Sequence, residues 1–189
     1  MMNSLLIRNV RLDGGGTDVL IEGNRFVRIA PGIECEGARV IDGSGKAIVP
    51  PFYNTHTHAA MTLLRGYADD VELSSWLNDY IFPREDRLDG RCVRAATTLA
   101  VAECLKFGVT SVSDMYYFCD DICDVIAKSG MKANISRGTS MFLGDDFDFE
   151  KFPACQELVA LKNKWHNFDG GRIKIEASIH AEYTSTYQL

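Results

Sequence analysis

Apolar and polar positions follow two different patterns along the chain, and the pattern changes near residue 47. In the first part, short apolar runs predict three β-strands, over residues 5–12, 19–22 and 25–29. The pair Gly23-Asn24 between the last two runs predicts a two-residue hairpin turn, since both residues tolerate positive φ. The glycine-rich segment 40–46 predicts another turn. Residues 1–46 are therefore expected to form a small β-module.

From residue 47 onward, strand-like and helix-like periods alternate. Strands are predicted to begin near residues 47, 109, 132 and 172. Helices are predicted over residues 91–107, 120–128 and 153–165. Repeated βα units imply a parallel sheet with right-handed crossovers. Residues 47–189 are therefore expected to form an α/β unit with four βα strands, half the number in a (β/α)₈ barrel, with two open sheet edges.

Chemically active side chains follow these strands at their carboxyl ends. They are His56, His58, Asp114, Arg137 and His180. Any one of them alone is typical of a loop or capping residue. In a (β/α)₈ barrel, however, the active site lies at the carboxyl ends of the strands. Four strand ends that all carry such residues therefore indicate one site at this edge of the sheet.

His56 and His58 are the strongest single signal in the chain. They follow the apolar run Ala47–Phe52, which predicts a short buried strand. Residues two apart in a strand point to the same side, so both imidazoles are expected to face one metal ion. Imidazole suits zinc, iron or nickel, and a catalytic zinc usually has three protein ligands and an open position. The alternative is a pair of histidines that binds no metal.

Composition narrows the classes of partner and location. The formal net charge of −6 over 189 residues argues against a nucleic-acid partner, which needs a basic face. No stretch approaches the length that spans a membrane. The N-terminus lacks the basic region and cleavage site of a signal peptide, and the six cysteines form no Cys-x-x-Cys pair. Reduced thiols and a cytoplasmic location are therefore expected.

Five segments together carry a resemblance to a known family. They are PPFYNTHTH at 50–58, MTLLRG at 61–66, IFPREDRL at 81–88, SDMYYF at 113–118 and SIHAEYT at 178–184. The His-x-His pair resembles the amidohydrolase superfamily of metal-dependent hydrolases in general. The segments around Glu85 and His180 narrow the resemblance to the methylthioadenosine/S-adenosylhomocysteine deaminases. The similarity runs along essentially the whole chain.

The resemblance implies a fold and a role for several residues. It implies the first half of a (β/α)₈ barrel (residues 47–189), preceded by part of a small composite β-sandwich (residues 1–46). His56 and His58 match the first two metal ligands, and Glu85 matches a glutamate that binds the ribose hydroxyls. Trp76, in the same loop as Glu85, is expected to form an apolar wall. Arg137 matches an arginine at the outer end of the substrate, and His180 matches a histidine near the reacting centre.

The implied reaction is hydrolytic deamination of S-adenosylhomocysteine or 5'-methylthioadenosine to the inosine analogue and ammonia. The expected cofactor is a divalent metal, with Zn²⁺ preferred over Fe²⁺ or Ni²⁺. The expected partner is this small adenosine derivative, with no nucleic acid and no membrane, and a homo-oligomer is compatible with the sequence. The alternatives are a guanine or cytosine deaminase or a chlorohydrolase of the same superfamily, and, in another class, a catalytically inactive fragment.

The chain also departs from the family pattern. The family's remaining metal ligands and its acid/base residues lie beyond strand four and have no counterpart before Leu189. The chain is therefore expected to be the N-terminal part of a longer protein, with no catalytic acid or base of its own. A second carboxylate-binding arginine is replaced by the acidic run 144–151, which weakens the case for a substrate with a free carboxylate. Pro51 and Tyr53 are also unusual for a buried strand.

Overall fold

The computed structural model describes residues 4–142 and 146–189, so Gly144 and Asp145 of the acidic run lie outside the described residues. The chain divides into two compact units, Met1–Pro50 and Pro51–Leu189. Within the described ranges, no helix combines the length and the apolar character needed to cross a membrane. All six cysteines are free thiols. The cytoplasmic location stays a prediction.

The first unit is a four-stranded mixed sheet with the order β3-β2-β1-β4. Its strands are β1 (Ser4–Leu12), β2 (Gly15–Glu22), β3 (Arg25–Ala30) and β4 (Arg39–Asp42). The predicted hairpin is confirmed, because β2 and β3 pair antiparallel around Gly23-Asn24. The turn predicted over residues 40–46 is partly wrong, because β4 pairs parallel with β1. The local pattern could not show this pairing, since the two strands are distant in sequence.

A buried aspartate, Asp18, is hydrogen-bonded to backbone segments of this unit. Asp18 is 6% exposed, and its two carboxylate oxygens accept hydrogen bonds from the backbone N–H groups of Asn9 (2.9 Å) and Ile33 (3.0 Å). These two bonds hold the pKa of Asp18 below its usual value. Ile33 in turn packs with Leu6 and Leu20 as the core of the unit. The carboxylate therefore stabilises the loop that covers one face of the sheet.

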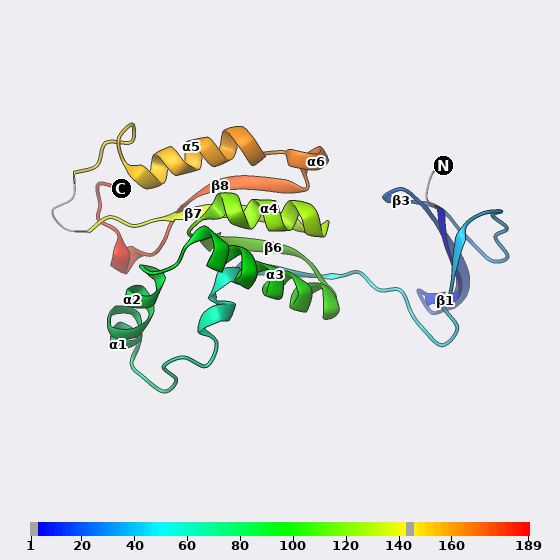
Figure 1. The fold of residues 1–189 in the computed structure, drawn as a ribbon. Coiled ribbons are helices and arrows are strands. Elements are labelled where there is room, and N and C mark those ends of the chain that lie inside the picture. The colour runs from blue at the N-terminus through cyan, green and yellow to red at the C-terminus, as the bar shows by residue number, and fades with distance from the viewer. Residues whose placement is uncertain (1–3, 143–145) are drawn as a thin grey trace. The chain divides into compact units, whose positions relative to one another are not determined.

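The second unit is a parallel sheet with the order β5-β6-β7-β8. Its strands are β5 (Phe52–Thr57), β6 (Val109–Tyr116), β7 (Lys132–Thr139) and β8 (Ile173–Ile179). The helices α3 (Gly90–Lys106), α4 (Cys119–Ser129) and α5 (Pro153–Trp165) connect them in turn, and a short turn of helix, α6 (Phe168–Gly171), leads into β8. Figure 1 shows the three long helices beside the strands. The expected fold class, part of a (β/α)₈ barrel, is confirmed by four parallel strands joined by three helical connections.

Alternation along the strands gives the sheet two different faces. Most helix-facing positions are apolar and pack into one core, which includes Val112, Ala133, Ile135, Ile173 and Ile175 with Ile122 and Ile126 of α4. The intervening positions are mostly polar, and include Ser111, Ser113, Asn134, Lys174 and Glu176. Burial of the apolar face against the helices holds the strands in register, and this register fixes which side chains meet at the strand ends.

The strand that carries the histidines differs from the prediction. The run Ala47–Phe52 is not a buried strand, because β5 begins only at Phe52 and Phe52 and Tyr53 are 67% and 64% exposed. β5 lies at the edge of the sheet and pairs only with β6 among the described strands. Pro51 directly precedes β5, so its missing N–H removes no bond from the ladder. Pro51 therefore fits a position just outside the strand.

The long connection between β5 and α3 is mostly helical. It contains a 3₁₀ turn η1 (Ala59–Leu64), α1 (Leu73–Ser75), a π-helical turn η2 (Trp76–Ile81) and α2 (Phe82–Glu85). α1 and α2 lie at the end of the sheet where the strands finish (Figure 1). A last 3₁₀ turn, η3 (Glu182–Thr184), follows β8. These short elements lie around the carboxyl end of the sheet and carry residues of the candidate site.

Candidate functional site

The two histidines of the His-x-His pair lie close together at the end of β5. The ring centres of His56 and His58 are 5.0 Å apart, with the rings nearly perpendicular. Two imidazoles on one tetrahedral ion, each with a metal–nitrogen distance of about 2.0–2.1 Å, have ring centres about 5 Å apart. The pair therefore has the spacing that two ligands of one metal ion require.

The neighbouring strand fixes the tautomer of His58. Its Nδ1 lies 2.6 Å from the backbone oxygen of Met115 in β6. A carbonyl oxygen can only accept, so Nδ1–H donates and Nε2 keeps its lone pair. Metal-binding histidines are typically oriented by this kind of bond to a backbone carbonyl. His58 therefore fits the role of a ligand through Nε2.

Asp114 anchors the backbone just beyond the histidines. It is 1% exposed, and its Oδ1 accepts a 2.7 Å hydrogen bond from the N–H of Ala59, while its buried Oδ2 has no partner among the described residues. Burial raises the pKa of Asp114 to about 7, and the bond from Ala59 partly offsets the rise. Asp114 thus positions the chain that follows His58.

Glu85 on α2 meets the end of β6 through a tyrosine. The Tyr116 hydroxyl donates a 2.7 Å hydrogen bond to Glu85 Oε1. Burial raises the pKa of the Glu85 carboxyl above its usual value, and the bond from Tyr116 opposes the rise. Tyr116 itself is buried, and burial together with Glu85 raises the pKa of its hydroxyl, which keeps it a neutral donor. The tyrosine therefore holds one carboxylate oxygen and leaves Oε2 for another donor.

His180 follows β8 and is also held in one tautomer. The hydroxyl of Thr184 donates to the backbone oxygen of Ala181 (3.2 Å), so His180 Nδ1–H must donate to Thr184 Oγ1 (2.7 Å). Burial, and then nearby His58, lowers the pKa of His180 below its usual value. His180 is therefore neutral near pH 7 and presents Nε2 as a hydrogen-bond acceptor.

Several of these side chains border one cavity at the carboxyl end of the sheet, whereas His56 is not among its described lining residues. The cavity has a volume of about 140 Å³, and its lining includes His58, Trp76, Glu85, Tyr116 and His180. A larger groove of about 710 Å³ adjoins it and shares Phe82, Glu85, Tyr117, Ser140 and His180 with it. The structure thus brings His58, Glu85 and His180 to one cavity, and their roles stay predictions.

Arg137 has a different environment from the other candidate residues. It pairs in register with Tyr116 and Ala177 and shares the helix-facing side of β7 with Ile135. Its Nε lies 2.5 Å from Glu157 Oε2 on α5, and its guanidinium lies 4.7 Å from the centre of the Tyr117 ring. Arg137 lines the groove but not the smaller cavity.

Sequence reasoning assigned no site role to two groups. The Met115 carbonyl that orients His58 could not be found from side-chain identity. Tyr116 left a weak signal, since it stands two residues after Asp114 and so points to the same side of β6.

The donor set around the histidine pair is incomplete within this chain. Over residues 4–142 and 146–189, no group of three or more His, Cys, Asp or Glu side chains is arranged to hold a metal ion. His56 and His58 are therefore fewer than the three protein ligands that a catalytic zinc usually has.

Comparison with known proteins adds family evidence. Residues 47–189 match the profile of the Amidohydrolase family. A 5'-deoxyadenosine deaminase of Methanosphaera stadtmanae is 39% identical over 90% of this chain. A 5-methylthioadenosine/S-adenosylhomocysteine deaminase of Carboxydothermus hydrogenoformans is 41% identical over 88% of it. The chain spans only 40% and 38% of the lengths of these two relatives.

The fold of this chain is also similar to that of a solved structure. An adenosine deaminase from Xanthomonas campestris, crystallised with bound zinc, is 28% identical and has a TM-score of 0.81. The similarity covers 97% of this chain and 44% of that one.

Proposed function

The chain belongs to the amidohydrolase family of metal-dependent hydrolases, and from that premise we propose that it forms the N-terminal part of an adenosine-derivative deaminase. The proposed substrates are 5'-substituted adenosines, such as S-adenosylhomocysteine, 5'-methylthioadenosine or 5'-deoxyadenosine. The products are the inosine analogue and ammonia. In this proposal residues 1–46 belong to a composite β-sandwich, and residues 47–189 are the first four units of the barrel.

One observation carries the proposal. The cavity at the carboxyl end of the sheet brings together an oriented histidine of the His-x-His pair, a half-buried carboxylate and a neutral histidine (His58, Glu85 and His180). A nucleoside offers a matching set of groups, since its diol donates hydrogen bonds and its base carries ring and amino nitrogens. No single one of these residues would indicate this substrate class.

We propose that His56 and His58 hold a divalent metal, with Zn²⁺ preferred. When bound, such an ion supplies the polarisation that makes water nucleophilic near neutral pH. The chain's own contribution is to orient His58 through the Met115 carbonyl and to fix the backbone after it through Asp114. The remaining ligands and the acid/base groups are proposed to come from the rest of the protein.

Three residues would bind the nucleoside. Glu85 Oε2 would accept hydrogen bonds from the ribose diol, since Tyr116 already occupies Oε1. His180 Nε2 would accept a hydrogen bond from the purine near the reacting carbon. Trp76 would supply an apolar wall for the ring system.

Two alternatives are separated by assay. Guanine, cytosine and triazine substrates lack a ribose, so the Glu85 carboxylate held by Tyr116 would have no diol to bind. The second alternative, an inactive fragment, is favoured for the isolated chain by its incomplete set of metal ligands. We therefore expect the 189-residue chain alone to show no turnover.

The test is a substrate panel on the full-length, zinc-loaded protein. The panel contains 5'-methylthioadenosine, guanine, cytosine and a chlorotriazine, and the readout is release of ammonia or chloride together with the change in the ultraviolet spectrum. The proposal expects turnover of the adenosine derivative only. Turnover of a base or triazine with no activity on any nucleoside would contradict it. His58→Ala serves as the control for metal-dependent activity.

A further inference from the structure

Arg137 is already paired, and this bears on which adenosine derivative the site accepts. Its Nε donates to Glu157 at 2.5 Å, and its Nη1 donates to the backbone oxygen of Gly138. Its guanidinium also lies 4.7 Å from the centre of the Tyr117 ring, and its side chain is only 16% exposed. One bidentate edge of a guanidinium is formed by Nε and Nη2. Glu157 closes that edge to any other carboxylate.

The pairing follows from the strand and helix geometry. Arg137 shares the helix-facing side of β7 with Ile135, so its side chain is directed toward the layer that holds α5. Glu157 lies in the second turn of α5, which packs on β7 and β8. The ion pair is thus built into the packing of α5 against the sheet.

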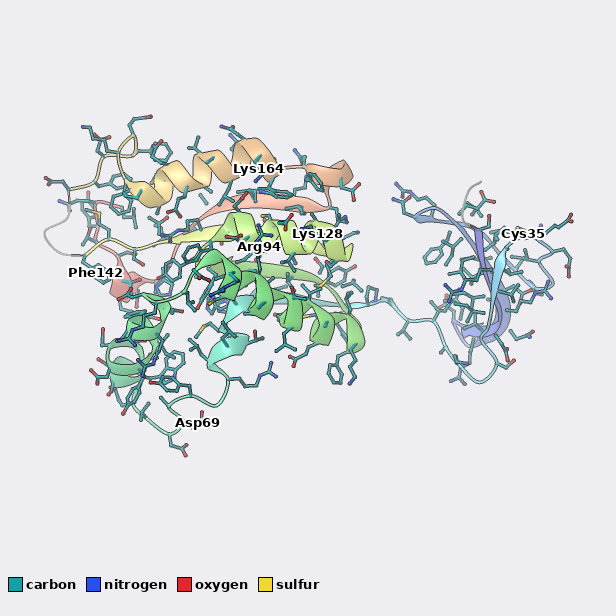
Figure 2. All side chains as sticks on the ribbon, in the orientation of Figure 1. Cys35, Asp69, Arg94, Lys128, Phe142 and Lys164 are labelled. Atoms are coloured by element: carbon teal, nitrogen blue, oxygen red, sulfur yellow. The ribbon has the colours of Figure 1, made fainter. Side chains whose placement is uncertain are left out.

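The groove beside this ion pair is rich in acidic groups. The other cation in its lining, Lys164 of α5 (Figure 2), contacts both carboxylate oxygens of Asp120, at 2.7 and 2.9 Å. The described lining holds five carboxylates, and they are Glu85, Asp86, Asp120, Asp121 and Glu157. Both cations are paired, so a carboxylate that enters the groove meets no free positive charge in its described lining.

In the proposed binding mode, the groove offers the space for the 5' end of a bound nucleoside. If the ribose diol binds Glu85 and the purine lies near His58 and His180, the small cavity is filled by these two parts. The adjoining groove shares Glu85 and Tyr117 with that cavity and is the larger of the two. A substituent on the 5' carbon therefore leaves toward Arg137 and Glu157.

We propose that Glu157 masks Arg137 and makes this site select adenosines whose 5' substituent carries no carboxylate. 5'-Methylthioadenosine and 5'-deoxyadenosine are then preferred over S-adenosylhomocysteine. This inference rests on the proposed function and deepens it, because it names the substrate class within the adenosine derivatives. Glu157 acts on specificity through Arg137.

The test compares three nucleosides on the full-length protein. They are 5'-methylthioadenosine, S-adenosylhomocysteine and decarboxylated S-adenosylhomocysteine, which keeps the length and the ammonium group and lacks only the carboxylate. The measurements are kcat/KM for deamination and Kd by calorimetry. The wild type should prefer both carboxylate-free nucleosides over S-adenosylhomocysteine by roughly two- to fivefold, as expected of a half-exposed charge pair.

Two variants isolate Glu157, and one is a control. Glu157→Gln removes the charge, and Glu157→Ala removes the whole contact with Arg137. Each variant should reduce the preference for carboxylate-free nucleosides over S-adenosylhomocysteine, and Glu157→Ala should reduce it at least as much as Glu157→Gln. Asp148→Asn removes the same charge from a surface carboxylate that pairs with Lys151 at 2.7 Å, outside the groove lining, and should leave the preference unchanged.

The outcomes separate this inference from the proposed function. Equal or better use of S-adenosylhomocysteine by the wild type would overturn the masking role of Glu157, as would a preference that neither variant alters. Failure of all three nucleosides to bind or react would instead overturn the proposed function, and the selectivity argument with it.

Discussion

The hydrogen bond between Tyr116 and Glu85 allows a sharp test of how the site would bind ribose. Tyr116→Phe removes only the hydroxyl and keeps the buried ring, so the packing of β6 is preserved. The carboxylate loses the donor that holds Oε1 at 2.7 Å and becomes free to rotate. We expect the diol to bind less tightly, because its acceptor is no longer fixed.

The expected size follows from the nature of this bond. A hydrogen bond to a charged partner contributes about 1.5–3 kcal/mol. Glu85 is only half-buried, so water partly replaces the lost donor and the lower end applies. About 1.5 kcal/mol corresponds to roughly a tenfold increase in KM or Kd.

The assay uses a matched pair of substrates, adenosine and 2',3'-dideoxyadenosine, on the full-length protein. Tyr116→Phe should raise KM for adenosine and leave KM for the dideoxy analogue nearly unchanged, since the analogue has no diol for Glu85. Tyr117→Phe is the control, because it removes the adjacent hydroxyl, which makes no hydrogen bond to Glu85 in the described part of the chain. An equal increase for both substrates would refute the reasoning.

Three further predictions concern stability and metal binding. Arg172→Ala should lower the free energy of unfolding by about 2–4 kcal/mol in urea titrations. The reason is that the Arg172 guanidinium donates hydrogen bonds to three backbone carbonyls in and just after the last turn of α4. A loss below about 0.5 kcal/mol would contradict this prediction. The pKa of Asp18 in the folded protein lies below its usual value, so the Asp18 carboxylate stabilises the first unit above about pH 4. This stabilisation is lost as the pH falls through the pKa of Asp18 in the folded state. Hydrogen exchange of the β1 amides should therefore speed up at low pH in the wild type and not in Asp18→Asn. Gly138→Ala would place a Cβ 3.2 Å from Met115 Cγ and should thereby displace the Met115 carbonyl that orients His58. We expect metal affinity, measured by chelator competition, to fall about tenfold. Unchanged affinity would show that the Met115 side chain moves without displacing its carbonyl.

Much of the fold was predictable because it depends on local periodicity. The alternation of apolar positions identified the strands β6, β7 and β8 and the helices between them, and this order requires a parallel sheet. Strand β4 was missed because four exposed residues carry no clear period and pair only with a distant strand. The strand expected over residues 47–52 was wrong in its bounds, because β5 begins only at Phe52, after two prolines that cannot donate to the ladder.

The site was predictable only where sequence spacing determines geometry. His56 and His58 are two residues apart in sequence, and strand geometry alone brings their rings together. The partner of His58, the Met115 carbonyl, depends on the register between β5 and β6, which is shifted by bulges and has no sequence signature. The partner of Glu85, Tyr116, depends on where α2 packs against the end of β6. The direction of Arg137 was available in principle, because it continues the helix-facing row of Ala133 and Ile135.

The central claim is that the histidine pair holds the metal of an adenosine-derivative deaminase. The most direct measurement is a zinc titration of the chelator-treated, full-length protein, with deamination of 5'-methylthioadenosine followed at each step. The account predicts no turnover without metal, activity that rises in proportion to added zinc, and no recovery in His58→Ala. Full turnover by the metal-free protein, or full recovery in His58→Ala, would contradict it.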